Sequence, residues 1–425
     1  MRYHIWTVGC QMNVADSQKL AAGLDRLGWS EVGQPAQADL VVLNTCAIRD
    51  HAEQRAISKL GTLKKLRGQG SEFKIAVMGC MVGLKTDELE RRFPFVDAFA
   101  QPQRFEPILE AVGYDDLGGE FWPAAFAASD SVTAYVPIIH GCDKFCTYCI
   151  VPYRRGRERS RTVDDIRVEV EHLAAKGVRE VTLLGQTVEA YGHDLDDRPD
   201  LGDLLRALHD IDGIARYRFL TSYPKDMTER IITAVAELPK VCAYFNIPVQ
   251  SGDNAVLERM RRGYDIELYR EKVGLIRRFA PDAAITTDVI VGFCGETDAE
   301  FQHTYDLLAD IEFDKVHVAA YSPRPGTIAH RKLEDDVPHE VKVARLHAVE
   351  QLEAGISGRI NSRFLGQDVE VLVEGEKPAA DGEPSLYGRT RANKLVHFSG
   401  DAMPGDLTTV RIERASPWSL VGTGL

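Results

Sequence analysis

The chain has 425 residues, of which 44% are apolar and 27% charged. This composition excludes a disordered or fibrous protein, and at roughly 100 to 200 residues per domain it predicts two to four domains. Residues 1–10 lack a secretion signal and no apolar run approaches the ~18 residues of a membrane span, so we expect a cytoplasmic protein without membrane contact. The chain has 51 Lys and Arg against 64 Asp and Glu, a net charge of -13. This charge argues against a protein that coats nucleic acid through its overall electrostatic field, so any contact with nucleic acid has to be local.

Three of the eight cysteines follow predicted strands in the N-terminal region. Apolar runs over 5–9, 40–45 and 75–79 end at Cys10, Cys46 and Cys80, and helical patterns lie between them over 16–27 and 51–66. This repetition predicts a parallel α/β sheet, in which the carboxyl ends of the strands share one edge. We therefore expect these thiols to converge. They could hold a metal cluster or be small apolar residues at strand ends, and their spacing leaves both interpretations open.

A tighter set of cysteines follows the predicted strand 134–139. Cys142, Cys146 and Cys149 lie in GCDKFCTYC, a spacing that wraps a short loop around one soft metal centre. A structural zinc site needs four ligands, and no second cysteine pair follows. Three thiolates can instead hold three irons of a 4Fe-4S cluster and leave the fourth iron open. Cys242 and Cys294 lack such neighbours and are expected to be structural.

Further predicted strands over 178–184, 217–221, 243–249, 284–291 and 315–321 alternate with helical stretches, one of which starts near Thr162. With 134–139 they make six strand–helix units, which predicts an open, partial barrel. In such barrels the chemistry lies at the carboxyl ends of the strands, where GCDKFCTYC falls. The strand-end segments 185–187, 221–224, 250–252 and 292–293 share that rim, although any one of them could be an ordinary loop.

A run of arginines lies just after the second cysteine set, at Arg154, Arg155, Arg157, Arg159 and Arg161. Charge runs are usually solvated surfaces that form ion pairs. In a chain of net charge -13, however, guanidinium groups beside a predicted reaction centre suit phosphate. We favour a contact with a nucleic-acid backbone over surface ion pairs.

From about Arg359 the pattern changes to short alternating strands that predict a small β-barrel of about 65 residues. Barrels of the OB type commonly bind single-stranded nucleic acid or oligosaccharide. The local basic patch here comprises Tyr387, Arg389, Arg391, Asn393 and Lys394, although an exposed hairpin could carry the same residues without binding anything.

Longer strings connect these features to a known family. They are GCQMN (9–13), NTCAIRDHAEQRA (44–56), GCDKFCTYCIVPYRRGRERSR (141–161), IPVQSG (247–252), YSPRPGT (321–327) and GRTRANKLVHFSG (388–400). The chain closely resembles the MiaB-type tRNA methylthiotransferases, which are radical S-adenosylmethionine enzymes, and the resemblance runs nearly end to end. It implies an α/β multidomain protein with a methylthiotransferase domain at 1–115, a radical core with a partial (β/α)6 barrel at 128–358 and a TRAM barrel at 359–425.

The resemblance also implies cofactors, partners and a reaction. Cys10, Cys46 and Cys80 would bind an auxiliary 4Fe-4S cluster, and Cys142, Cys146 and Cys149 the radical cluster, with S-adenosylmethionine contacted by Gly185, Gln186 and Ser222 of the rim. The substrate would be the N6-isopentenylated adenosine beside a tRNA anticodon, converted to its 2-methylthio form with two S-adenosylmethionine molecules. The Arg run, Arg389, Arg391 and Lys394 would contact the RNA. An electron donor such as flavodoxin or ferredoxin and a sulfur donor complete the expected partners.

The chain departs from the family pattern at Thr187, Tyr223, Asp253 and Cys294, which lie at the predicted rim. The nearest alternatives are methylthiolation of threonylcarbamoyl-adenosine in tRNA or of a ribosomal protein. GCQMN and GRTRANKLVHF favour the isopentenyl-adenosine branch. A non-catalytic iron–sulfur module that binds RNA is a third possibility, and it would make no 5′-deoxyadenosine.

Overall fold

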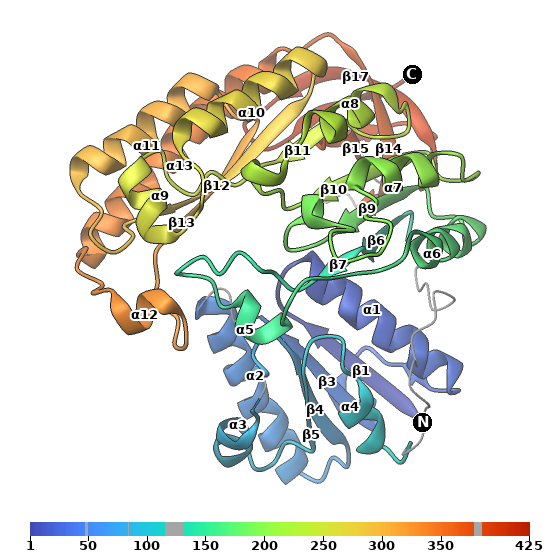
Figure 1. Cartoon of the computed structure of the whole chain (residues 1–425). Helices are drawn as coiled ribbons and strands as arrows, with labels where there is room; N and C mark the ends of the chain where they lie inside the picture. The colour runs from blue at the N-terminus through green and yellow to red at the C-terminus, as the bar shows by residue number, and fades with distance from the viewer. Residues whose placement is uncertain (47–49, 84, 115–130, 378–384) are drawn as a thin grey trace.

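The computed structural model describes residues 1–46, 50–83, 85–114, 131–377 and 385–425. Figure 1 shows an N-terminal α/β domain in blue below an arc of central helices, with a small C-terminal barrel in red behind the arc. Within those ranges, no helix combines the length and the apolar character that crossing a bilayer requires.

The N-terminal domain is a parallel five-stranded sheet in the order β2-β1-β3-β4-β5, which confirms the predicted α/β architecture. Leu40 and Val42 of β3 pack with α1 and α4 on one face, and Val41 and Leu43 pack with α2 and α3 on the other. The strand order reverses between β1 and β3, and such a switch point opens a crevice at the carboxyl ends of the strands. The elements are β1 (Arg2–Thr7), α1 (Gln11–Arg26), β2 (Ser30–Glu31), β3 (Leu40–Thr45), α2 (Asp50–Gly68), β4 (Lys74–Gly79), α3 (Asp87–Arg92), β5 (Ala98–Ala100) and α4 (Glu106–Glu110).

The six predicted strands of the central domain are present as two parallel three-stranded sheets, β10-β9-β6 and β11-β12-β13. A single parallel bridge from Tyr217 to Val241 joins them into one open, curved wall. Thr162 caps α6 as expected, because its side chain accepts a hydrogen bond from the amide of Asp165. The strands are β6 (Thr133–Pro137), β9 (Glu180–Leu184), β10 (Arg216–Leu220), β11 (Tyr244–Asn246), β12 (Ala284–Val291) and β13 (Lys315–Ala320).

Helices pack around this wall. The apolar residues of α6, α7, α8, α10, α11 and α13 form one large core with the strands, and those of α9 and α12 form a separate, smaller cluster. The helices are α6 (Val163–Ala175), α7 (Leu201–His209), α8 (Glu229–Glu237), α9 (Asn254–Met260), α10 (Ile266–Phe279), α11 (Asp298–Ile311), α12 (Ile328–Lys332) and α13 (His339–Ser362), with short 3-10 turns η3 (Val188–Ala190) and η4 (Pro224–Asp226).

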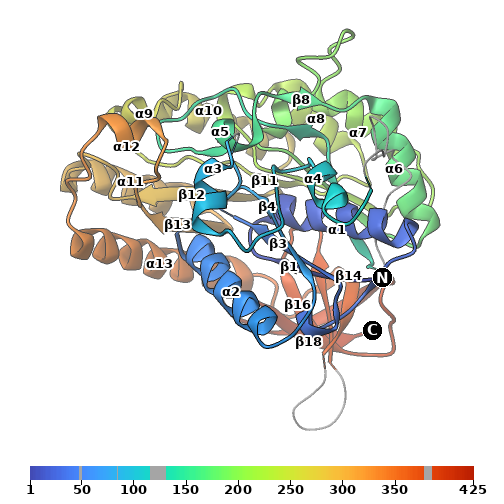
Figure 2. The same cartoon turned by 90° about the horizontal axis from the view of Figure 1, so that it is seen from below.

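An excursion of the chain leaves the carboxyl end of β6. A two-stranded ribbon of β7 (Ile139–His140) and β8 (Arg159–Ser160) closes its base, and α5 (Val151–Arg155) lies inside it. Figures 1 and 2 both place α5 between the central helices and the N-terminal domain. The excursion therefore carries the second cysteine set and the arginine run to the boundary between two domains.

The C-terminal domain is a closed five-stranded barrel in the order β14-β15-β16-β18-β17. The change to strands comes later than expected, because α13 runs through Arg359 and the first barrel strand begins at Asp368. The barrel is tied to the amino ends of the central strands, where Arg218 donates to the carbonyls of Thr390 and Arg391 at 2.6 and 2.7 Å. The strands are β14 (Asp368–Lys377), β15 (Ser385–Thr390), β16 (Leu395–Ser399), β17 (Leu407–Ala415) and β18 (Leu420–Gly424).

Candidate functional site

The first cysteine set follows three neighbouring strands. Cys10, Cys46 and Cys80 come after β1, β3 and β4, which pair side by side, and the amide of Cys80 donates to the carbonyl of Thr45 at 2.8 Å. Cys46 and Cys80 are buried, and Cys10 is partly exposed at the start of α1. The three thiols therefore lie at the carboxyl ends of adjacent parallel strands, beside the switch point of the sheet, as expected from the strand order.

A buried amide network holds these strand ends together. Asn13 donates to the side chain of Asn44 at 2.8 Å and to the carbonyl of Thr45 at 3.1 Å, while Asn44 donates back to the carbonyl of Asn13 at 2.7 Å. The Cys10 thiol donates to Asn13 at 3.4 Å. At Gly79, which has φ +95°, a Cβ would lie 2.4 Å from the carbonyl oxygen of Thr45. This close packing leaves room only for glycine before Cys80.

The thiols of this set are close enough to influence one another. Burial raises the pKa of Cys80 to about 11, the neighbouring Arg155 opposes that rise, and Cys46 and Cys10 add to it. Among the described side chains, no three His, Cys, Asp or Glu have the geometry of a site for a single metal ion. In a 4Fe-4S cluster, by contrast, each cysteine ligand binds a different iron.

The second set lies inside the excursion closed by β7 and β8. The amide of Cys142 donates to the carbonyl of Gly156 at 3.1 Å, which holds the two ends of the loop together. Phe145 has φ +48°, an unfavourable conformation for a side chain of this size that indicates a tightly constrained turn. Burial raises the pKa of Cys149 to about 12, and Cys146 and Cys142 raise it further, so these thiols also lie together.

Hydrogen-bond donors surround the second set. The backbone amides of Lys144 and Val151 donate to the sulfurs of Cys142 and Cys149. Arg262 points Nη1 at the sulfur of Cys146 at 3.4 Å. Such N–H···S contacts stabilise thiolates and are one of the means by which proteins adjust iron–sulfur clusters. The donor set of three soft thiols and several N–H groups therefore fits an iron–sulfur cluster.

Arg262 is a buried residue that the sequence analysis missed. Besides Cys146, it donates to Tyr148 at 3.3 Å, to Tyr264 at 2.9 Å and to the carbonyl of Pro248 at 3.2 Å. Its guanidinium also lies over the ring of Tyr223, 4.8 Å from the centroid. It follows helix α9 directly after Arg261, and nothing in the sequence pattern distinguishes it from that exposed neighbour.

The rim residues assigned to S-adenosylmethionine lie at the ends of β9 and β10. Gly185 packs so closely that a Cβ would lie 2.5 Å from Cγ2 of Ile139. Oε1 of Gln186 is buried and has no hydrogen-bond partner among the described residues, which leaves it available to a ligand. Ser222 is buried beside Glu189, a carboxyl that the sequence analysis missed, and burial raises the pKa of Glu189 to about 7. Buried unpaired polar groups at a rim indicate a binding site.

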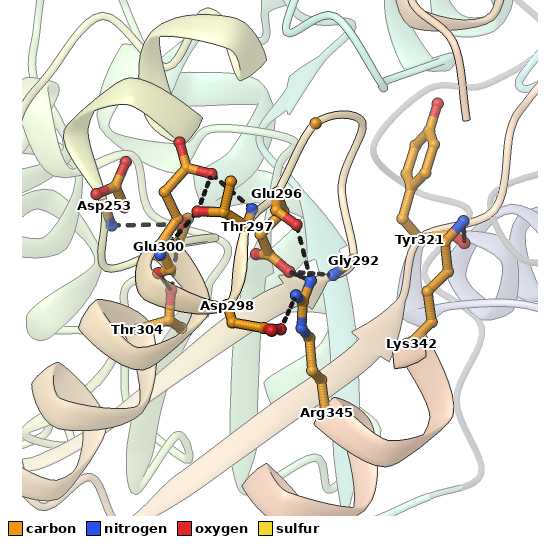
Figure 3. Close-up of polar contacts among 12 residues, drawn as sticks. Asp253, Gly292, Glu296, Thr297, Asp298, Glu300, Thr304, Tyr321, Lys342 and Arg345 are labelled. Atoms are coloured by element: carbon orange, nitrogen blue, oxygen red, sulfur yellow. Dashed lines mark hydrogen bonds and ion pairs between the residues drawn. The ribbon is translucent and has the colours of Figure 1, made fainter. Parts of the chain in front are cut away.

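Side chains of α13 hold the rim loop after β12 in place. Figure 3 shows Arg345 of α13 reaching Glu296 and Asp298, with distances of 2.8 and 2.7 Å. Glu296 in turn accepts from the amide of Gly292 at 2.5 Å. Lys342, also drawn in Figure 3, donates to the carbonyl of Tyr321 at 3.3 Å and is paired with Asp335.

The four departures from the family pattern have different positions. Thr187 and Tyr223 belong to the site, because Thr187 Oγ1 lies 3.8 Å from the Cys142 sulfur and the Tyr223 ring supports Arg262. Asp253 caps α9 by accepting from the amides of Ala255 and Val256. Cys294 lies in an apolar cluster with Phe293 and Tyr321, as expected for a structural cysteine.

The arginine run does not form one exposed surface. Arg157 and Arg159 are exposed, and the Arg157 side chain is 72% accessible even though it pairs with Asp143 at 2.8 Å. The Arg155 side chain is buried against Asp16 at 3.1 Å, whereas the Arg161 side chain is 17% accessible and pairs with the buried Glu169 at 2.5 Å. The expectation that all five contact RNA is therefore corrected for Arg155, because a buried ion pair occupies its guanidinium group, and it stays a prediction for Arg161. Arg154 is partly buried beside Gly83.

The basic patch of the C-terminal barrel is also largely turned inward. Arg391 donates to the carbonyls of Pro239 and Val241 at 2.7 and 2.8 Å, and Lys394 pairs with Asp314 at 2.8 Å. These two residues attach the barrel to the central domain, which argues against the expected contact with RNA. Arg389 lies 3.4 Å from Glu374 and is 39% accessible.

Three sequence profiles match the chain. The radical SAM superfamily matches residues 136–308, the uncharacterized protein family UPF0004 matches 2–101, and the TRAM domain matches 362–425. Membership of the radical SAM superfamily implies a 4Fe-4S cluster and S-adenosylmethionine, which agrees with the donor set around Cys142, Cys146 and Cys149.

Solved structures share the fold at low sequence identity. A radical S-adenosylmethionine methyltransferase, TsrM, from Kitasatospora setae covers 77% of this chain and 77% of its own, with TM-score 0.57 and 14% identity. The cobalamin-dependent S-adenosylmethionine radical enzyme OxsB covers 83% and 56%, with TM-score 0.53 and 12% identity.

Curated relatives are similar over nearly the whole chain. A protein of Roseiflexus sp. (strain RS-1) is 46% identical over 99% of this chain and 89% of its own length, and one of Dehalococcoides mccartyi (strain CBDB1) is 44% identical over 98% and 97%. Both are named tRNA-2-methylthio-N(6)-dimethylallyladenosine synthase. At this identity and coverage, the chain belongs to the tRNA-2-methylthio-N(6)-dimethylallyladenosine synthase family of radical SAM enzymes.

Proposed function

We propose that the protein converts N6-isopentenyladenosine beside a tRNA anticodon into its 2-methylthio derivative. The observation that carries this proposal is the end-to-end similarity to synthases of that name, 46% identical over 99% of the chain. The intact second cysteine set and the closed C-terminal barrel support it. Because tRNA is a cytoplasmic substrate, we place the reaction in the cytoplasm.

We further propose that Cys10, Cys46 and Cys80 hold a second 4Fe-4S cluster. Their place at a switch-point crevice and their mutual influence on the pKa of Cys80 support this assignment. The set faces the excursion that carries the other three cysteines, since Arg155 of α5 contacts both Asp16 and Cys80. Two sites on either side of one domain boundary would let a transferred group and a substrate radical meet.

In this reaction the residues of the chain bind and orient the reactants, and they exclude water. Bound at these sites, the clusters and S-adenosylmethionine supply the chemistry that no side chain can perform on the unactivated C–H bond at carbon 2 of adenine. Arg262 fixes Cys146, while Gly185, Gln186 and Ser222 provide close backbone approach and polar atoms for S-adenosylmethionine. The protein takes electrons from a donor such as flavodoxin or ferredoxin, and sulfur from a donor protein or sulfide.

We assign RNA binding to the two exposed arginines of the excursion, Arg157 and Arg159. Anticodon loops suit such a site because their bases can be splayed out of the stack. Each lost phosphate contact should reduce the salt slope of RNA binding by about one. We therefore expect Arg159→Ala to weaken binding of an anticodon stem-loop and flatten its salt dependence, measured by fluorescence anisotropy at several salt concentrations.

Lys394→Ala is the matched comparison. It removes a cation that pairs with Asp314 across a domain boundary, so it should leave the salt slope unchanged and lower stability by about 1 to 3 kcal/mol. A flattened slope with Lys394→Ala, at unchanged urea midpoint, would restore this residue to the RNA surface.

The proposed function is tested by an anaerobic reaction of reconstituted, reduced protein with S-adenosylmethionine, sulfide and an isopentenylated anticodon stem-loop. Mass spectrometry should detect both 5′-deoxyadenosine and the 2-methylthio nucleoside. Deoxyadenosine without the nucleoside would reject the substrate and direct attention to threonylcarbamoyl-adenosine tRNA or a ribosomal protein. If neither product forms in cluster-replete protein, the result favours a non-catalytic iron–sulfur module that binds RNA.

A further inference from the structure

An exposed tryptophan lies where the C-terminal barrel meets the central domain. Trp418 is 58% accessible in the turn between β17 and β18, and Nζ of Lys315 lies 4.1 Å from its ring centroid. Hydrogen bonds fix this turn. Ser416 Oγ accepts from the amide of Trp418 at 3.2 Å, and Asn361 of α13 donates to the carbonyls of Ser416 and Pro417 at 2.8 and 3.3 Å. The aromatic ring is therefore presented to solvent from a constrained turn.

The ring borders a cavity of about 280 Å³ between the two domains. Asn361 lines the cavity and is 3% accessible. Because its amide nitrogen donates to two carbonyls, its Oδ1 is the remaining acceptor, and this buried oxygen has no hydrogen-bond partner among the described residues. His317 and Asn393 add further polar atoms to the lining. Buried acceptors are normally paired, so an unpaired one in the wall of a cavity points to a ligand.

The charges around the cavity favour a neutral ligand. Three cations of the lining are each paired with a carboxylate: Lys315 with Glu353 at 3.0 Å, Arg389 with Glu374 at 3.4 Å, and Lys394 with Asp314 at 2.8 Å. A phosphate would therefore meet no unbalanced cation, whereas a planar group with polar edges would meet an aromatic face and hydrogen-bonding atoms. These are the properties of a nucleobase, and unpaired RNA bases are commonly bound by stacking on aromatic side chains.

The cavity is separated from the reaction centre by the length of one strand. Lys315 begins β13, and His317 and Ala319 follow on the same face of that strand, both exposed. This face leads to the carboxyl end of β13 at Ala320. At about 3.3 Å per residue the strand spans roughly 20 Å, which corresponds to about six stacked nucleotides at ~3.4 Å each. A base in the cavity would thus belong to the same stem-loop as the target adenosine but to a different nucleotide.

The simplest alternative is a surface tryptophan that only covers Lys315 at the domain junction. Single exposed apolar residues are common on protein surfaces. This alternative accounts for the contact with Lys315, but it leaves the buried Oδ1 of Asn361 unexplained.

We propose that this cavity binds one unpaired base of the tRNA substrate, which stacks on Trp418 and donates an N–H group to Oδ1 of Asn361. The inference rests on the proposed function and adds to it a second point of attachment, about one strand length from the rim. Holding a second nucleotide of the same loop fixes the register in which the target adenosine enters the site.

The test measures binding of an isopentenylated anticodon stem-loop to the full-length, cluster-loaded protein by fluorescence anisotropy. Trp418→Ala removes the ring, and Trp418→Phe keeps an aromatic face. Met403→Ala is the matched control, because Met403 is an exposed apolar residue of the same domain that lies outside the cavity. A series of stem-loops, each lacking the base of one loop nucleotide, identifies the base that is bound.

Trp418→Ala should weaken binding about 5- to 150-fold, the range for losing one base–aromatic stack, with an unchanged salt slope because no phosphate contact is lost. Trp418→Phe should retain most of the affinity, and Met403→Ala should bind like the parent. One abasic stem-loop should weaken binding to the parent but have no further effect on Trp418→Ala, because both changes remove the same contact.

Parental affinity of Trp418→Ala at an unchanged urea midpoint would overturn this inference and leave the proposed function intact. The same conclusion would follow if every abasic stem-loop weakened binding equally in the parent and in Trp418→Ala. Failure of the parent itself to bind the stem-loop would overturn the proposed function, and this inference with it.

Discussion

Cys80→Ala should abolish the 2-methylthio nucleoside while 5′-deoxyadenosine continues to form, whereas Cys146→Ala should abolish both products. The reason is the separation of the two cysteine sets, one at the strand ends of the N-terminal sheet and the other in the excursion from β6. Each set has three thiols, so losing one leaves too few ligands for a stable cluster. Mass spectrometry of anaerobic reactions, with iron analysis of each variant, measures both effects.

Cys242→Ala is the control for these variants. Cys242 is buried near the amino ends of the central strands and belongs to neither set. It should retain both products. If Cys80→Ala keeps thiolating at the parental rate with reduced iron content, the N-terminal set has no part in the reaction, and the assignment of a second cluster fails.

Local patterns were sufficient to predict the architecture. The strand expected at 284–291 is β12 with the same bounds, and β6, β9, β10, β11 and β13 fall within one residue of the other predicted runs or inside them. Buried parallel strands read as continuous apolar segments, and the helices between them have clear start and stop residues. The convergence of Cys10, Cys46 and Cys80 followed from the same logic, because parallel strands place their carboxyl ends at one edge.

The roles of the charged residues could not be predicted from local sequence patterns. Arg155 and Asp16 are 139 positions apart, and no local pattern shows that a ribbon folds one onto the other. Likewise Lys394 looks like an RNA contact until the barrel is docked and its ammonium meets Asp314. Composition and spacing report where cations occur in the chain, whereas their function depends on burial and on partners that only the assembled domains supply.

The same distinction explains why Arg262 was missed. It stands next to Arg261 in the sequence, yet Arg261 is exposed with φ +56° at the end of α9, while Arg262 turns into the barrel. Because Arg261 adopts a left-handed backbone conformation, the chain changes direction at this residue. The guanidinium of Arg261 therefore stays in solvent, while that of Arg262 is buried. The contact of Arg262 with Cys146 thus depends on a backbone detail that sequence periodicity does not report.

Arg262→Ala should lower the stability of the apo protein by about 3 to 5 kcal/mol, the range for truncating a large buried side chain. The change removes donors to Cys146, Tyr148 and Pro248 and the cation above the Tyr223 ring. Arg262→Lys should recover only part of this loss, because an ammonium cannot satisfy a planar set of acceptors. Urea unfolding of cluster-free protein measures stability without any contribution from iron.

Arg261→Asn is the matched control, because asparagine tolerates the left-handed backbone and the exposed side chain has no role in the site. It should unfold at the parental urea concentration and reconstitute normally. Iron reconstitution of Arg262→Lys should then be impaired at the second set alone, seen as loss of 5′-deoxyadenosine formation with the N-terminal cluster signal retained. If Arg262→Ala matches Arg261→Asn in both measurements, the guanidinium neither stabilises the barrel nor holds Cys146, and the rim must derive its rigidity from the Gly292 loop and Arg345 instead.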